Sequence, residues 1–259
     1  MLIQNLQNIK AATEYAEKIN KPEVWTEIGK AQLDQFAIRE AIDAFIKARD
    51  ASMYALVIGT AGNQDCYEEL VQFLLMARSM LKEQMIDSEL IFAYAKCGQR
   101  YLPELEQFIS EPNQADIQKC GDRCYDEKLN EAAKILYQHV GNNQKLAQVL
   151  VKLKQYQAAF EAAKKADIPK VWKEVCFVCV RAKEFRTANM CAMKIIILPD
   201  HLEDLIKHYE KYGFHEELIL LLEQGMSLER SHQGIYTELG ILYAKFVPQR
   251  LMDHIRTYA

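Results

Sequence analysis

The stretch that decides the fold is Trp172-Lys-Glu-Val-Cys-Phe-Val-Cys-Val-Arg-Ala-Lys-Glu-Phe-Arg-Thr-Ala188. It predicts two helices, because Trp172 begins one amphipathic run and Phe185 begins another. The turn between them, Lys183-Glu184-Phe185, is short, and this predicts an antiparallel helical hairpin. Cys176 lies one helical turn after Trp172 on the same face, where a small side chain lets the second helix come close.

The same pattern recurs along the whole chain. In each unit a residue that is usually apolar or aromatic lies three places before a small or apolar one, at the start of the second helix. The second members of these pairs are 27 to 35 residues apart, with a mean of 30. That period is typical of a solenoid built from two-helix repeats. The eight pairs are Ile38–Ala41, Tyr67–Leu70, Leu102–Leu105, Leu129–Ala132, Tyr156–Ala159, Phe185–Ala188, His215–Leu218 and Pro248–Leu251.

The first helix of a unit begins about sixteen residues before the second member of the pair, at Trp25, Tyr54, Trp172 and Ile235. One turn further along, several units have a small residue. Glycine costs about 1 kcal/mol inside a helix, so we expect close approach of the partner helix, whose facing residue is often alanine. These small residues are Gly29, Ala93, Gly121 and Cys176.

Proline marks the predicted helix starts. Pro22, Pro112, Pro169 and Pro199 each follow a break in the apolar pattern, and we expect each in the first turn of a helix behind a capping side chain. No segment has the alternation of a strand or the length of a linker. The fold class that we predict is therefore all-α, with residues 1–259 forming a single α-solenoid (α-zigzag) of antiparallel two-helix repeats.

Both ends of the chain read as unfinished repeats. Residues 2–18 have the pattern of a second helix alone, and the last unit stops at Tyr258-Ala259. Solenoids normally close with a modified repeat that has a polar outer face. We therefore expect a segment of a longer rod, truncated at both ends.

Composition excludes several classes of protein. Apolar residues make up 50% of the 259 residues, and the net charge is −4, which gives a core but no basic footprint for nucleic acid. No run approaches the eighteen apolar residues of a membrane span, and the first residues lack the pattern of a signal peptide. The seven cysteines are an odd number, and reduced thiols predict a soluble cytoplasmic protein.

The two cysteine pairs have a structural interpretation. Cys176 and Cys179 match C-x-x-C, and Cys120 and Cys124 form a second pair. A zinc ribbon needs two pairs brought together by loops, whereas these lie within amphipathic helices of different repeats. We expect buried packing residues, with no metal and no cofactor.

Other groups of polar residues have no catalytic pattern. His201, His208 and His215 recur every seven residues, and we expect solvated side chains; a second hypothesis makes some of them a partner contact that weakens as pH rises. Adjacent acids such as Glu203-Asp204 and Glu216-Glu217 are expected to cap helices and face solvent. No phosphate loop or nucleophile elbow is present, so we predict that the chain is not an enzyme.

Several runs resemble the clathrin heavy chain family, in order along essentially the whole chain. The most specific is Gln118-Lys-Cys-Gly-Asp-Arg-Cys-Tyr-Asp-Glu-Lys128, which continues to Glu131-Ala-Ala-Lys-Ile-Leu-Tyr137. The sequence departs from the family at Leu129-Asn130, at a longer loop over Gln99–Pro103 that explains the 35-residue spacing, and at Ile195–Pro199. Further matching runs are Val24-Trp25, Lys30–Leu33, Glu89–Lys96, Tyr156–Ala159, Trp172–Phe177 and Lys183–Arg186.

The resemblance implies a structural coat protein rather than a catalyst. The chain would be a leg segment, from the distal end through the knee to the start of the proximal leg. Legs of other heavy-chain molecules would lie beside it in the polyhedral lattice of coated pits and vesicles, on the cytoplasmic side, in endocytosis and vesicle-mediated transport. The implied partners are other heavy chains, the clathrin light chain, and membranes reached indirectly through adaptors, with no nucleic acid.

The resemblance also implies where a partner binds. In the family, the regulatory end of the light chain reaches basic residues near the knee, and the light chain lies along the proximal leg. Arg78 and Lys82 are the matching candidates at the knee, and Lys245 and Arg250 those at the start of the proximal leg. Ordinary solvated charges are the alternative at all four positions.

Two other classes of function stay open at this point. A helical-repeat scaffold subunit of a vesicle tethering or sorting complex uses the same type of repeat, but would lack the run from Gly121 to Lys128. A metal or redox enzyme that used the cysteines would bind zinc or have thiols of low pKa.

Overall fold

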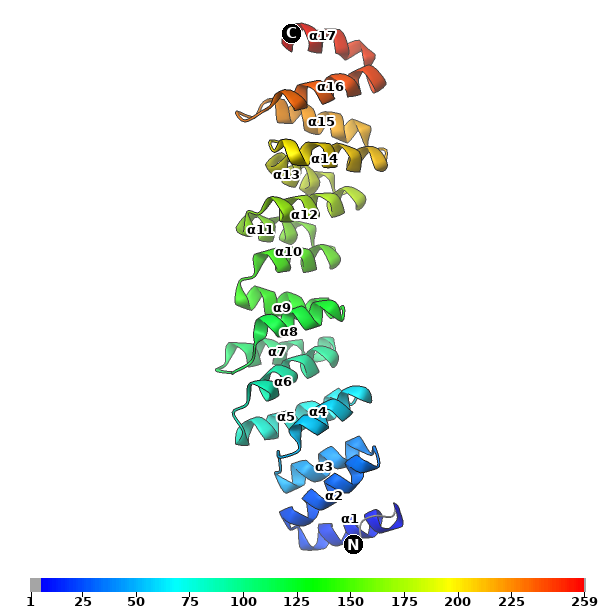
Figure 1. Cartoon of the computed structure of the whole chain (residues 1–259), viewed down its shortest axis with the longest axis vertical. Helices are drawn as coiled ribbons and strands as arrows, with labels where there is room; N and C mark the ends of the chain where they lie inside the picture. The colour runs from blue at the N-terminus through cyan, green and yellow to red at the C-terminus, as the bar shows by residue number, and fades with distance from the viewer. Residues whose placement is uncertain (1–5, 259) are drawn as a thin grey trace. The chain divides into compact units, whose positions relative to one another are not determined.

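The computed structural model describes residues 6–258, which form seventeen α-helices, one 3₁₀ helix and no strand (Figure 1). The chain divides into two compact units, Met1–Val140 and Gly141–Ala259. In each unit, successive helices pack as neighbours, as expected for an all-α solenoid.

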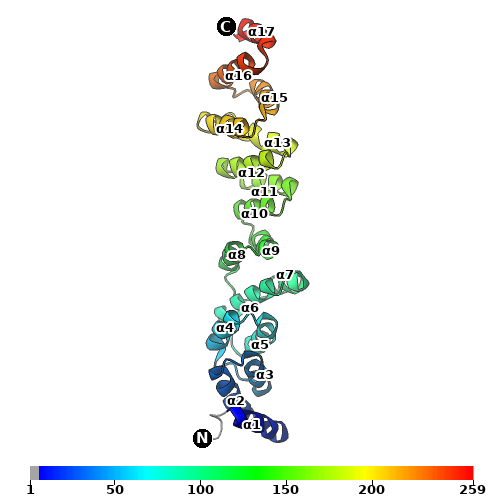
Figure 2. The same ribbon diagram turned by 90° about the vertical axis from the view of Figure 1, so that its right-hand side faces the viewer.

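The helices of the first unit are α1 (Leu6–Ile19), α2 (Pro22–Asp34), α3 (Ile38–Ala48), α4 (Tyr54–Asn63), α5 (Tyr67–Met80), α6 (Gln84–Lys96), η1 (Gln99–Tyr101), α7 (Leu102–Ser110), α8 (Ile117–Asp126) and α9 (Asn130–Val140). Those of the second unit follow one another in a stack (Figure 2) and are α10 (Asn143–Lys152), α11 (Tyr156–Ala166), α12 (Pro169–Arg181), α13 (Phe185–Ile195), α14 (Pro199–Lys211), α15 (His215–Met226), α16 (Gln233–Phe246) and α17 (Pro248–Tyr258).

The repeat pattern locates the second helices closely. Seven of the eight predicted pairs begin at the first residue of a helix, and α9 begins one residue after Leu129. The first helices α2 and α12 begin three residues before Trp25 and Trp172, at prolines. Residues 2–5 of the predicted N-terminal helix lie outside the described residues, and α1 covers the rest of that prediction.

The turn within a helix pair has one recurring geometry. Lys154 and Lys183 adopt left-handed backbone, with φ of 59° and 62°. The next amide then reaches back to the last turn of the first helix: Gln155 N–H donates to the Leu150 carbonyl and Glu184 N–H to the Cys179 carbonyl, each at 2.9 Å. This is the Schellman arrangement that ends a helix. It confirms the short antiparallel turns that the sequence predicts.

The small residues on the first helices do allow close approach. A Cβ at Gly29 would lie 3.0 Å from the ring of Phe45, and a Cβ at Gly121 would lie 3.0 Å from the ring of Tyr137. The partner helix therefore fills the space at each glycine, as predicted. The facing residue is an aromatic ring at both places rather than the expected alanine.

Two local predictions were wrong. Pro112 lies in the loop between α7 and α8, five residues before the helix that Asp116 caps by accepting a hydrogen bond from Lys119 N–H. Pro22, Pro169 and Pro199 do lie in first turns, but no side chain caps those helices. Apolar packing rather than capping holds these starts.

The 35-residue spacing has more than one source. The connection between α6 and α7 spans residues 97–101, compared with three residues in the α12–α13 turn. Helix α5 has 14 residues, whereas α3, α9, α11 and α13 have 11 each. The loop therefore explains only part of the longer spacing, because α5 is three residues longer than those helices.

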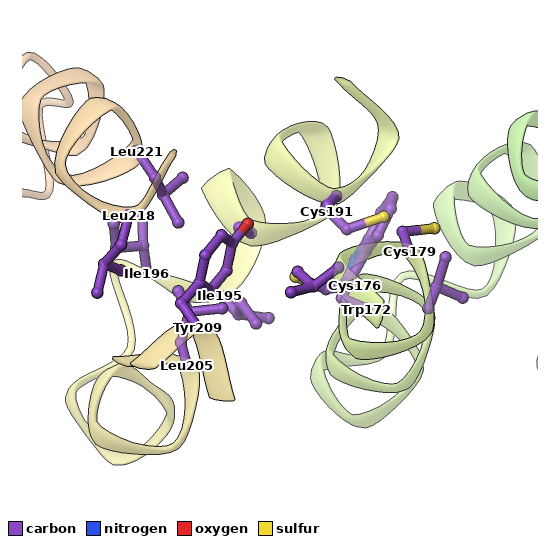
Figure 3. Packing of buried hydrophobic residues seen from close by; sticks show 14 of the residues in the cluster. Trp172, Cys176, Cys179, Cys191, Ile195, Ile196, Leu205, Tyr209, Leu218 and Leu221 are labelled. Carbon is purple, nitrogen blue, oxygen red and sulfur yellow. The ribbon is translucent and has the colours of Figure 1, made fainter. Parts of the chain in front are cut away.

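The core of the second unit continues from one repeat to the next. Trp172 is buried, its ring centroid lies 5.5 Å from that of Phe160 on the preceding helix, and its indole N–H donates to Asp167 Oδ1 at 3.2 Å. Figure 3 shows the cysteines of α12 and α13 in the same core as Tyr209. Each repeat thus covers the apolar face of its neighbour.

Candidate functional site

Arg78, near the end of α5, holds four parts of the first unit together. Its Nε–H donates to Asp87 Oδ1 on α6 at 2.9 Å, and its Nη2–H donates to the Pro112 carbonyl at 2.8 Å. The guanidinium carbon also lies 4.7 Å from the ring centroid of Phe108 on α7. The predicted partner-binding cation is thus bound within the fold.

Asp87 explains why Arg78 is held there. The residue is only 5% exposed, and a buried carboxylate is costly unless charge and hydrogen bonds compensate it. Arg78 supplies the charge, and Gln114 N–H donates to Asp87 Oδ2 at 2.8 Å. The pair fastens the α7–α8 loop against α5 and α6.

Lys82 differs from Arg78. It follows the end of α5 and is exposed, and no hydrogen bond or ion pair of residues 6–258 involves it. With Leu75, Ser79 and Arg78 it lines a groove of about 400 Å³ beside the α7–α8 loop. Leu75 and Pro112 are the apolar residues of this groove, and the exposed Lys82 suits an acidic segment.

The other two candidates lie in the second unit, on different helices. Lys245 Nζ on α16 is 3.8 Å from Glu210 Oε1, and Arg250 Nη1 on α17 is 2.8 Å from Glu223 Oε1. The Tyr243 hydroxyl donates to the same Glu223 oxygen at 2.5 Å. Burial is the main cause that raises the pKa of Tyr243 to about 12, and the hydrogen bond to this carboxylate is the second. Each cation thus pairs with its own acid, Lys245 with one on α14 and Arg250 with one on α15.

The cysteines are packing residues, as predicted. All seven are free thiols, and Cys176 and Cys179 lie side by side with Cys191 in the core of Figure 3. Burial raises the pKa of Cys179 to about 12 and that of Cys176 well above its ordinary value. Cys120 and Cys124 follow the same rule, with burial raising their pKa values to about 11 and about 12. Such thiols are poor nucleophiles and poor ligands.

The three histidines are partly exposed and partly packed within the fold, so the prediction of solvated side chains holds only in part. His208 Nε2 lies 3.0 Å from the Phe177 carbonyl, and its ring stacks on Phe177 with centroids 4.0 Å apart. His215 stacks on Phe246 at 4.1 Å, and the Nδ1 atoms of His201 and His215 are buried without a hydrogen-bond partner. His208 and His215 thus join repeats of the same chain.

The adjacent acids lie at the surface, mostly as predicted. Glu203 pairs with Lys207, Asp204 pairs with Lys173, and Glu216-Glu217 lie in the first turn of α15, where the helix dipole favours negative charge. Among residues 6–258, no group of three or more His, Cys, Asp or Glu side chains is arranged to hold a metal. No helix in that range is long and apolar enough to cross a bilayer.

Asp87 is the functional residue that sequence reasoning missed. It lies in the run Met85-Ile-Asp-Ser-Glu-Leu-Ile-Phe92, where the sequence alone does not distinguish a buried aspartate from a solvated one. Its one signal is the neighbourhood of Ile86, Leu90 and Ile91, which are all fully buried. A carboxylate between such residues needs a cation, and Arg78 lies nine residues away.

Comparison with known proteins agrees with this architecture. The family model described as "Region in Clathrin and VPS" matches residues 45–187 and 194–259. The clathrin heavy chain of Drosophila melanogaster is 48% identical over 258 residues, and the clathrin heavy chain 2 of Homo sapiens is 46% identical over 258 residues. Both alignments cover the whole of this chain, which spans about 15% of the length of the curated relatives. The chain belongs to the clathrin family.

Proposed function

We propose that this chain is a leg segment of a clathrin coat, which packs beside the legs of other heavy chains to build the polyhedral lattice of coated pits and vesicles. The observation that supports this most strongly is the unbroken similarity to clathrin heavy chains along every repeat. The fold agrees, because stacked helix pairs offer long surfaces, and the cysteines, histidines and acids serve packing or solvation. The role is mechanical rather than catalytic.

The mechanism that we infer is multivalent assembly. One leg contact is weak, but each contact after the first is effectively intramolecular, so many weak contacts give a stable cage. Within the second unit, the continuous core around Trp172 joins each repeat to the next, which supports this proposal. A scaffold subunit of a sorting complex is not favoured, because the relatives to which this chain is similar are clathrin heavy chains.

The partners are part of the same proposal. They are other heavy-chain legs, the clathrin light chain and, indirectly, membranes reached through adaptors on the cytoplasmic side. At the knee candidate, Lys82 would meet an acidic segment of the light chain, while Arg78 holds the wall of the groove. Lys245 and Arg250 stay predicted contacts at the start of the proximal leg, and each would exchange its present acid for one on the partner. One solenoid over residues 1–259, cut from a longer rod, also stays a prediction.

A chimera tests the proposal. In the Drosophila melanogaster heavy chain, the matching 258 residues are replaced by this chain, and purified trimers are assembled and sedimented. The account predicts cages that pellet and show closed polyhedra by electron microscopy. Folded trimers that do not pellet, beside an unmodified heavy chain that does, would contradict it.

A further inference from the structure

The charge of the chain is divided unevenly along its length. Residues 1–140 contain 15 Lys or Arg and 22 Asp or Glu, a net charge of −7. Residues 141–198 contain eleven Lys or Arg and four Asp or Glu, a net charge of +7. The net charge of the whole chain, −4, does not reveal this contrast. Residues 141–198 form a basic stretch that covers α10 to α13.

Four of these cations lie at one edge of the second unit. Lys154 is in the α10–α11 turn, and Arg181, Lys183 and Arg186 surround the α12–α13 turn. The two turns are neighbours, because α10 packs on α12 and α11 packs on α13 (Figure 1). All four side chains are exposed, and none forms an ion pair within the described part of the second unit. We call Lys154, Arg181, Lys183 and Arg186 the basic edge.

Local structure does not account for three of the four. Lys154 and Lys183 occupy left-handed positions, where glycine fits without steric cost and a lysine does not. Arg186 is in the first turn of α13, where the helix dipole disfavours a cation. At the opposite edge, Lys164 and Lys165 lie in the last turn of α11, where the dipole favours them. The basic edge is therefore the part of the stretch that needs another explanation.

An acidic counterpart is present in the first unit. Helix α7 is the one helix of that unit, among the described residues, with two acids and no base. Glu104 and Glu106 on this helix, and Glu111 directly after it, are exposed and form no ion pair within residues 6–258. We call these three glutamates the acidic face.

We propose that the basic edge of one copy of this chain docks on the acidic face of a second copy. The inference rests on the proposed function, in which copies of the chain lie side by side, and it names the surfaces that meet. Charge complementarity selects the partner, because opposite unpaired charges attract and fix the register of two surfaces. The contact is of the weak, salt-dependent kind that a reversible lattice uses.

The experiment measures self-association of the 259-residue chain by sedimentation equilibrium at low ionic strength. The basic-edge variant is K154E/R181E/K183E/R186E, and the acidic-face variant is E104K/E106K/E111K. Either alone is expected to lower the association constant about tenfold, since several exposed pairs of modest strength act together. Mixing the two variants is expected to restore association, because the unchanged basic edge of one variant matches the unchanged acidic face of the other, and the two reversed surfaces match as well.

The matched control is K164E/K165E/K170E/K194E, which makes the same charge change at the opposite edge of the same helices. It is expected to keep the association constant within about threefold of the wild type. A wild-type chain that stays monomeric at every concentration would overturn the proposal, as would an equal loss in the control. If the chimeric heavy chain forms cages while the basic-edge variant associates normally, this inference fails and the proposed function stands.

Discussion

Arg78 on α5 and Lys183 in the α12–α13 turn are both cations at the end of a helix, but only Arg78 is paired within the fold. Arg78 is bonded to Asp87 and to the Pro112 carbonyl, and it covers the ring of Phe108. Lys183 is exposed and adopts a backbone conformation that does not suit it. The comparison teaches that a cation already paired within the fold stabilises it, whereas an unpaired one is available to a partner.

The largest expected effect is at the paired cation. Arg78→Ala leaves Asp87 buried without its counterion, and we expect a loss of about 3 kcal/mol in the free energy of unfolding. Urea denaturation followed by circular dichroism measures this loss. Arg250→Ala is the control, with an expected loss below about 1 kcal/mol, because that ion pair is at the surface. Equal losses in the two variants would remove the distinction between a buried and a surface ion pair.

The same contrast holds for two glycines of the first unit. A Cβ at Gly121 would press on Tyr137, whereas a Cβ at Gly59 in α4 would have no atom within 4 Å. We therefore expect Gly121→Ala to destabilise by about 1–3 kcal/mol, and Gly59→Ala to stabilise by about 1 kcal/mol through helix propensity. Thermal unfolding of both variants gives the signs, and stabilisation at both positions would show that the α8–α9 pair is not closely packed.

The available cation should respond in the opposite direction to Arg78. Lys183→Gly removes the left-handed strain, and we expect a gain of up to about 1 kcal/mol in unfolding free energy. Lys164→Gly, inside α11, should lose about 1 kcal/mol, since glycine weakens a helix. If the account is right, Lys183→Gly raises stability and weakens self-association together. A variant that loses stability would place Lys183 among the residues that hold the fold.

The smallest expected effect is a pH dependence near the basic edge. Burial lowers the pKa of His208, the hydrogen bond to the Phe177 carbonyl opposes this in part, and the charges of Arg181 and Lys211 lower the pKa further. The folded state therefore favours neutral His208, while the unfolded chain takes up a proton near pH 6.5. This contribution to stability is complete above pH 6.5 and is lost as pH falls below it.

Urea denaturation at pH 5.5 and 7.5 measures this contribution. His208→Gln should reduce the difference between the two pH values. Arg181→Gln should raise the pKa of His208 and reduce the difference by a smaller amount. A stability that rises as pH falls in the wild type and not in His208→Gln would contradict the assignment.

Much of the fold follows from the sequence, because large and small side chains recur at fixed positions in each repeat. The pairs that begin with Tyr67, Tyr156 and Phe185 mark helix starts to the residue, and Gly29 and Gly121 mark close approaches. The identity of the facing side chain does not follow, because Phe45 and Tyr137 come from the partner helix and not from the sequence around the glycines. The position of Pro112 does not follow either, because Asp87 and Arg78 fix that loop from other helices.

The sequence predicts which charged residues belong to the candidate site, but not which of them are paired within the fold. The resemblance selects Arg78 and Lys82 together, and only packing separates them, since Asp87 lies on a different helix. The basic edge was hidden by the total charge of the chain, although the lysines at residues 154 and 183 hold equivalent positions in the sequence pattern. Their left-handed backbone is a property of the turn, and composition does not reveal it.

The most direct measurement is zero-length carbodiimide cross-linking within cages assembled from an equal mixture of ¹⁴N-labelled and ¹⁵N-labelled chimeric heavy chains. The account predicts cross-linked peptides that contain both isotopes and join Lys154 or Lys183 of one molecule to Glu104 or Glu106 of another. Cages in which every cross-link involving this segment carries a single isotope would contradict the claim that copies of this chain meet side by side through these surfaces.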